Sequence, residues 1–96
     1  VAPAEVEERL NQLPGIEESA CIGIPDPSGL TGEVVKAFLV WDEGADKPTP
    51  AELTKGLRKE LEGYKIPTVF VWTERLPRTS SGKLQRLLLR EDDEDT

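Results

Sequence analysis

A single lysine in a serine- and glycine-rich stretch is the residue of this sequence best suited to chemistry. Lys83 directly follows Ser80, Ser81 and Gly82, and it precedes a short basic stretch. Serine hydroxyls donate hydrogen bonds, glycine lets a backbone approach a ligand closely, and lysine supplies a mobile positive charge. These residue types suit contact with a phosphate or a carboxylate. If one residue of this chain does chemistry, we expect it to be Lys83, with Ser81 and Gly82 as its candidate ligand-binding neighbours.

Spacing alone leaves two interpretations of this stretch open. A phosphate-binding P-loop is rejected, because it requires glycine at position 77 and serine or threonine at position 84, where this chain has Pro77 and Leu84. The first remaining interpretation is a plain surface turn that leads into a capped helix. The second is a catalytic or anion-orienting lysine, which would need a partner domain to hold its ligand.

The charge distribution singles out the same part of the chain. The 96 residues carry a net charge of −7, and residues 1–74 hold 7 basic and 14 acidic side chains. Residues 75–90 hold five basic side chains and no acidic one, whereas residues 91–95 are all acidic. The acidic balance argues against a nucleic-acid partner. The basic segment either faces an anion or neutralises residues 91–96, which we expect to be a disordered acidic tail.

Composition restricts the compartment and the kinds of site. With no histidine and a single cysteine, the chain cannot form an internal disulfide, and a zinc site is not expected. Cys21 lies in an apolar run and has no histidine to activate it, so we expect a small buried hydrophobic residue. A lone cysteine fits the reducing cytoplasm. No apolar run approaches the roughly 20 residues that span a bilayer, so no membrane span is expected.

Hydrophobic spacing and capping signals predict six elements. They are a helix over residues 3–13, strands over 20–24, 34–41 and 68–72, a helix that begins at the Thr49–Glu52 capping box and ends at Gly63, and a short helix over 84–90. We therefore predict one α+β domain in the order α-β-β-α-β-α, with a small three-stranded sheet and helices on one face. Such a chain lacks the enclosed volume that most complete enzymes use to surround a drug-sized ligand, which suggests a part of something larger.

A longer pattern around Lys83 resembles a known signature. It is Pro-x-Thr-x-Ser-Gly-Lys-x-x-Arg, over residues 77–86. It resembles the terminal signature of the adenylate-forming superfamily, which comprises acyl- and aryl-CoA synthetases, luciferases and the adenylation domains of peptide synthetases. Further segments are similar to the C-terminal domain of those enzymes in the same order, with most likeness to acyl-CoA synthetases: residues 3–7, 23–26, 32–33, 37–40 and 64–67.

The resemblance implies a mobile lid domain over residues 1–90 of an ATP-dependent, AMP-forming acid–thiol ligase. It implies that Lys83 enters the active site when a carboxylate attacks the α-phosphate of ATP. The acyl group then passes to a thiol, that of coenzyme A or of a carrier-protein pantetheine, with coenzyme A favoured by the likeness to free-standing synthetases. Ser81 and Gly82 are then candidate cofactor-binding residues, although Ser81, like Thr79, is expected mainly to shape the loop. The partner is a missing N-terminal adenylation domain, which would also hold magnesium and the AMP product, so this chain alone is expected to be inactive.

Three further expectations concern matched residues outside the loop. Arg86 is expected to hold the loop or to meet the larger domain, without a catalytic role. Tyr64 and Lys65 are expected to fix the link between the second helix and the third strand. Trp41 and Trp72 are expected to pack rather than to form a ligand platform.

Two alternative functions remain beside the lid domain. Residues 77–83 resemble the motif around a lysine that regulatory acetyltransferases modify in such synthetases, so Lys83 could be a substrate of a lysine acetyltransferase. The domain could also be a stand-alone interaction module. The acid that the enzyme would activate is not readable from this chain.

Overall fold

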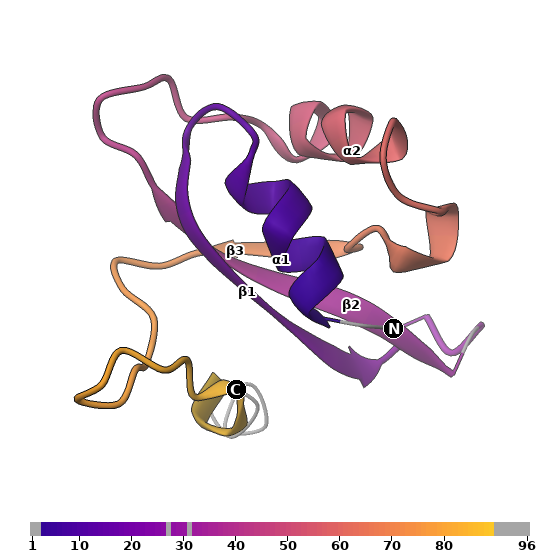
Figure 1. The fold of residues 1–96 in the computed structure, drawn as a ribbon. Helices are drawn as coiled ribbons and strands as arrows, with labels where there is room; N and C mark the ends of the chain where they lie inside the picture. The colour runs from indigo at the N-terminus through magenta and orange to yellow at the C-terminus, as the bar shows by residue number, and fades with distance from the viewer. Residues whose placement is uncertain (1–2, 27, 31, 90–96) are drawn as a thin grey trace.

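The sheet has three strands, and chain segments cover both of its faces (Figure 1). The computed structural model describes residues 3–26, 28–30 and 32–89. The elements are α1 (Pro3–Asn11), β1 (Ile16–Pro25), β2 (Glu33–Trp41), α2 (Pro50–Arg58), a 3-10 turn (Gly63–Lys65) and β3 (Val69–Trp72). β1 pairs antiparallel with β2, and β3 pairs parallel with the other edge of β2. The predicted α+β class with a three-stranded sheet is confirmed.

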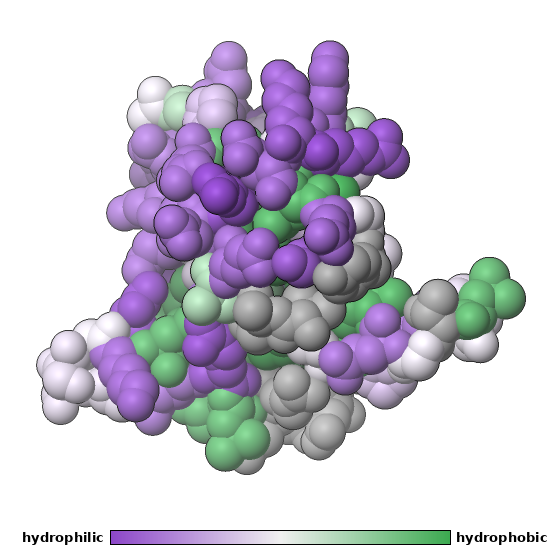
Figure 2. All heavy atoms as spheres, turned by 45° about the vertical axis from the view of Figure 1, so that its right-hand side comes forward, coloured by the Kyte–Doolittle hydropathy of each residue, from purple (hydrophilic) through white to green (hydrophobic). Residues whose placement is uncertain are grey.

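Helices α1 and α2 lie together on one face of the sheet (Figure 1). Val6 and Leu10 stand four residues apart on α1, as Leu53 and Leu57 do on α2, and all four are buried. This spacing gives each helix one apolar stripe, which it buries against the sheet. Polar side chains cover the outer side of α2, in the upper part of the view in Figure 2.

The chain that follows β3 covers the opposite face of the sheet. Leu76 and Leu89 are buried there and pack with Ala20, Ile22 and Phe38 in a second apolar cluster. We expected every helix on one face, and this was wrong for the last helical turn, residues 86–89. The physical reason is that successive residues along a strand point to opposite faces of the sheet. In β1 and β2, apolar residues occupy both sets of positions. Each face therefore needs cover.

Several element ends differ from the prediction. Strand β1 begins at Ile16 instead of Ala20, because Ile16 pairs with Trp41 across a bulge between Ile16 and Glu18. Helix α2 ends at Arg58, and Gly63, five positions further along the chain, starts the 3-10 turn instead of ending the helix. Leu61 is nevertheless buried, because the turn that follows the helix at residues 59–60 places its side chain in the core.

Two predictions about the chain's end have different outcomes. The last helical turn begins at Arg86 rather than at Leu84, because Leu84 instead forms an isolated antiparallel bridge with Arg78. The expected disordered tail, residues 91–96, lies outside the described residues. Within the part of the chain that is described, no helix is long and apolar enough to cross a membrane.

Candidate functional site

Lys83 ends a tight turn that begins at Thr79. The Gly82 amide donates a hydrogen bond to the Thr79 carbonyl (2.9 Å), and the Thr79 amide donates to the Lys83 carbonyl (2.8 Å). The Lys83 amide in turn donates to Oγ1 of Thr79 (3.1 Å). Gly82 has φ = +88°, a left-handed conformation that favours glycine. The turn is therefore held by its own backbone and by one threonine hydroxyl.

The side chains of the turn point mostly to solvent. Ser81, Gly82 and Lys83 are exposed, and the hydroxyl oxygens of Thr79 and Ser81 lie 2.9 Å apart. Among the described residues, no hydrogen bond or ion pair engages Nζ of Lys83. The expectation that Thr79 shapes the loop is confirmed, since its backbone and hydroxyl make the closing contacts. Lys83 presents its charge outward from a defined backbone.

Arg78 joins the turn to the sheet. Its Nη2 lies 2.7 Å from Oε1 of Glu18 on β1, and its Nη1 donates to the Gly82 carbonyl (2.9 Å). Both partners of the ion pair are about one-third exposed, with side-chain accessibilities of 37% and 38%. Exposed ion pairs contribute little to stability. The role of Arg78 is therefore to position Gly82, the residue before Lys83, through the hydrogen bond to its carbonyl.

A second ion pair, whose acid is more deeply buried, follows the turn. Arg86 donates from Nε to Oε2 of Glu7 (2.9 Å) and from Nη2 to Oε1 of the same carboxylate. Glu7 Oε2 also accepts the Cys21 amide of β1 (2.7 Å), and only 8% of Glu7 is exposed. Hydrogen bonding to Glu7 raises the pKa of Arg86 above its ordinary value. Of our two expectations for Arg86, the structure shows that it holds the segment after the loop.

Glu7 is a site residue that the sequence analysis did not identify. It looked like one of several acids near the start of a helix, where negative charge is common. A signal was available, because Glu7 precedes the buried Leu10 by three residues and so lies on the inward helix face. An acid on that face needs a buried partner.

Lys65, Trp41 and Trp72 make contacts within the domain, whereas the expected role of the Tyr64 side chain lies outside what the structure describes. Nζ of Lys65 lies 3.1 Å from Oε2 of Glu5, which ties the 3-10 turn to α1 and agrees with the expected fixing of this link. Nζ of Lys47 lies 5.6 Å from the ring centroid of Trp41 and 4.8 Å from that of Trp72. A lysine thus bridges the two indoles, in a cation–π arrangement that pins the loop before α2.

Cys21 is a free and buried cysteine, and its thiol is unreactive. Burial, with a further contribution from the Glu7 carboxylate, raises the pKa of its thiol to about 12. Because the thiolate is the nucleophilic form of cysteine, this side chain is an inert part of the core. The prediction of a buried hydrophobic cysteine is confirmed.

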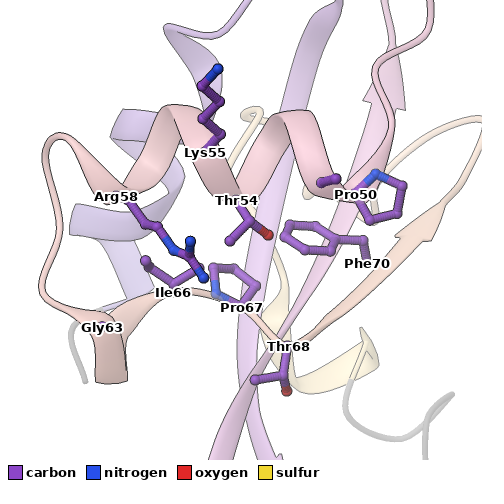
Figure 3. Close-up of a pocket in the computed structure, with 10 residues that line it drawn as sticks. Pro50, Thr54, Lys55, Arg58, Gly63, Ile66, Pro67, Thr68 and Phe70 are labelled. Atoms are coloured by element: carbon purple, nitrogen blue, oxygen red, sulfur yellow. The ribbon is translucent and has the colours of Figure 1, made fainter.

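A hollow of the surface lies away from the lysine turn. It is an open groove of about 550 Å³ between α2 and β3, and Lys83 is not among the residues that line it. Figure 3 shows Arg58 and Phe70 reaching toward Thr54 and Pro67 from its two ends. Within the described residues, no group of three or more histidine, cysteine, aspartate or glutamate side chains could hold a metal ion.

Known proteins are similar to this chain in sequence and in fold. Residues 5–83 match the family described as AMP-binding enzyme C-terminal domain. Feruloyl-CoA synthase of Amycolatopsis is 46% identical over 84 residues, which cover 88% of this chain and 16% of that enzyme. A long-chain-fatty-acid–CoA ligase of Escherichia coli is 37% identical over 92 residues, which cover 96% of this chain and 16% of the ligase.

Solved structures with a similar fold are enzymes of the same kind as these relatives. An acyl-CoA synthetase of Brucella canis superposes with a TM-score of 0.88 at 34% identity, over 99% of this chain and 18% of that one. ATP-bound MatB of Rhodopseudomonas palustris superposes with a TM-score of 0.85 at 37% identity, over the same shares of the two chains. This chain spans about one sixth of the length of its curated relatives. It belongs to the family of AMP-binding enzyme C-terminal domains, whose relatives here are acyl-CoA synthetases and ligases.

Proposed function

We propose that residues 1–90 work as the C-terminal catalytic lid of an ATP-dependent, AMP-forming acyl-CoA ligase. In this proposal Lys83 supplies the positive charge for acyl-adenylate formation. The observation that carries it is the exposed Lys83 at the end of a closed turn, in a domain whose relatives are CoA ligases. An exposed cation on a well-held backbone is suited to insertion into a site that another domain forms.

The chemistry explains why a lysine is useful at this step. A carboxylate oxygen attacks the α-phosphorus of ATP, the bond from that phosphorus to the bridging oxygen of the β-phosphate breaks, and pyrophosphate leaves. Two anions approach each other, and negative charge grows on the α-phosphate oxygens in the transition state. A cation that is already in place stabilises this charge without reorganisation. In the second step the thiol loses its proton, its sulfur bonds to the acyl carbon, and the bond from that carbon to the phosphate oxygen breaks, so that AMP leaves.

The residues of the turn fit one anionic contact rather than a whole nucleotide. Lys83 offers an ammonium group, and Ser81 and Gly82 are exposed beside it. The large groove of the domain lies elsewhere, so we propose that an N-terminal adenylation domain holds ATP, magnesium and the acyl substrate. Ser81 and Gly82 would contact the nucleotide only when the two domains close. We expect this enzyme in the cytoplasm, with no nucleic-acid partner and with coenzyme A as the thiol.

The test separates the two half-reactions of the complete ligase. Lys83→Ala should lower acid-dependent ATP–pyrophosphate exchange by about 10²- to 10³-fold, while thioester formation from supplied acyl-adenylate and coenzyme A stays near the wild-type rate. Lys59→Ala, which removes an exposed lysine just after α2, serves as the matched control and should change neither rate. Equal loss of both half-reactions in Lys83→Ala would contradict the proposal.

The exposure of Lys83 also favours a second, compatible role as a substrate for regulatory acetylation. A protein acetyltransferase would transfer the acetyl group of acetyl-CoA to Nζ, with loss of one proton and release of coenzyme A. The product is neutral, so it could no longer balance the charge of the adenylation step. Peptide mass spectrometry after incubation with an acetyltransferase and acetyl-CoA should find the modification on Lys83 in preference to Lys59. An unmodified Lys83 would count against this role.

A further inference from the structure

The pair of Glu7 and Arg86 joins the first helix of the domain to its last helical turn. The two residues are 79 positions apart in the sequence, and both oxygens of the carboxylate accept from the guanidinium. The same carboxylate accepts the Cys21 amide at 2.7 Å. One side chain therefore fixes α1, β1 and the segment after the lysine turn relative to one another.

This contact is poorly explained by stability alone. Only the acid of this pair is buried, since the side chains of Glu7 and Arg86 are 11% and 40% exposed. Burial removes hydration from the carboxylate, and a partly exposed ion pair contributes little net stability. An apolar residue would suit position 7, which lies beside Cys21 and the core. Apolar side chains, however, would not fix the orientation of the residue at position 86. A guanidinium that binds a carboxylate with two parallel hydrogen bonds is held in one orientation.

The chain between Arg86 and Lys83 is short and well held. The Gln85 amide donates to the Pro77 carbonyl (2.9 Å), and Leu84 pairs with Arg78. A rotation or shift of the Arg86 backbone would therefore move Lys83, which lies only three residues earlier. The other fixed point of the turn is Arg78 with Glu18. The two arginines are similarly exposed, but Glu18 is 38% exposed and Glu7 only 11%, so solvent screens the Glu18 pair more.

We propose that Glu7 and Arg86 are positioning residues for Lys83, whose placement their ion pair determines during acyl-adenylate formation. This inference rests on the proposed function of Lys83 and adds two residues to it. Neither residue needs to touch the substrate, because each acts through the backbone of the lysine turn. A displacement of about 1 Å can cost a catalytic group about 10²-fold in rate.

The decisive experiment measures Arg86→Gln in the complete ligase, alone and together with Lys83→Ala. Alone, Arg86→Gln should lower the kcat of adenylate formation by about 10- to 100-fold, leave the KM for ATP unchanged, and spare thioester formation from supplied acyl-adenylate. In the Lys83→Ala background, the same substitution should cause no further loss, because its effect passes through the lysine. Glu7→Gln should show the same pattern, since it keeps an oxygen for the Cys21 amide.

Two further variants separate positioning from folding. Arg86→Lys keeps the charge but loses the paired geometry, so its adenylation rate should lie between those of wild type and Arg86→Gln. Arg9→Gln removes another arginine–glutamate pair, that of Arg9 with Glu60 at 3.6 Å, and should leave adenylation unchanged. Thermal unfolding of each variant identifies the temperature range in which it is folded.

The outcomes distinguish this inference from the function on which it rests. If Lys83→Ala does not impair adenylation, the proposed function fails and the inference fails with it. If Lys83→Ala impairs adenylation but Arg86→Gln does not, only the positioning role is overturned. Equal loss of both half-reactions in Arg86→Gln, or an additional loss in the Lys83→Ala background, would also overturn it, because each indicates a general structural defect.

Discussion

Thr79 and Lys83 hold each other across the ends of one tight turn. The Thr79 amide donates to the Lys83 carbonyl at 2.8 Å, and the Lys83 amide donates to the Thr79 hydroxyl oxygen at 3.1 Å. Thr79 thus pairs with both backbone groups of the proposed catalytic lysine, its carbonyl and its amide. Its side chain is left at the surface, so the backbone is ordered while the charge stays available.

Thr79→Val should loosen this turn without unfolding the domain. Valine has the shape of threonine but cannot accept the Lys83 amide, and a net hydrogen bond is worth about 1 kcal/mol. Because the turn is exposed, we expect a loss of at most about 1 kcal/mol in the free energy of unfolding, measured by urea denaturation. Adenylate formation by the complete ligase should fall several-fold. Thr79→Ser keeps the hydroxyl and should restore most of the rate; equal rates in the two variants would contradict this role.

Gly82→Ala and Gly29→Ala form a matched pair for the role of the turn. Gly82 has φ = +88° and Gly29 has φ = +75°, and nothing lies within 4 Å of a Cβ added at either position. Each substitution should therefore cost only left-handed backbone strain, about 1 to 2 kcal/mol of unfolding free energy. Only Gly82→Ala should also slow adenylate formation. A similar loss of activity in Gly29→Ala would show that destabilisation alone explains the effect.

The elements of this fold could be predicted because local signals mark them. The Thr49 hydroxyl accepts the Glu52 amide at the start of α2, as the capping box indicates. The lysine turn was found in the same way, from serine and glycine next to Lys83. Both features depend on residues a few positions apart, and such short-range chemistry is visible in a single sequence.

What could not be predicted depends on pairings distant in the chain. Glu7 and Arg86 lie 79 positions apart, and no spacing rule connects them. The parallel pairing of β3 with β2 and the cover of the second sheet face by Leu76 and Leu89 are likewise set by tertiary packing. The apolar residues were evident, but which face each would cover was not.

Leu76→Ala should show how strongly the segment after β3 is anchored to the sheet. Leu76 is 6% exposed, and truncating a buried leucine costs about 2 to 5 kcal/mol through lost burial and the cavity that remains. Leu87, which is 67% exposed, offers the same substitution at the surface and should change the unfolding free energy by less than about 0.5 kcal/mol. Urea denaturation of the isolated domain measures both values. Similar small effects would contradict the anchoring of this segment in the second apolar cluster.

Alkaline pH should destabilise the domain through Cys21. The pKa of its thiol is about 12 in the folded state, whereas an unfolded cysteine ionises near pH 8.5. The folded state therefore retains a proton that the unfolded chain releases, and its stability is complete below the unfolded pKa and declines as pH rises toward 12. The folding equilibrium constant should fall by about tenfold per pH unit in that interval from this one group.

Cys21→Ala isolates this contribution from the lysines and the tyrosine, which also titrate at alkaline pH. The variant is less stable at pH 7 because it leaves a small cavity, but it has no thiol to ionise. The stability difference between wild type and variant should therefore shrink as pH rises from 8 to 11, measured by urea denaturation at each pH. Parallel stability curves would mean that the folded thiol ionises as readily as an unfolded one. That result would contradict its burial beside the Glu7 carboxylate.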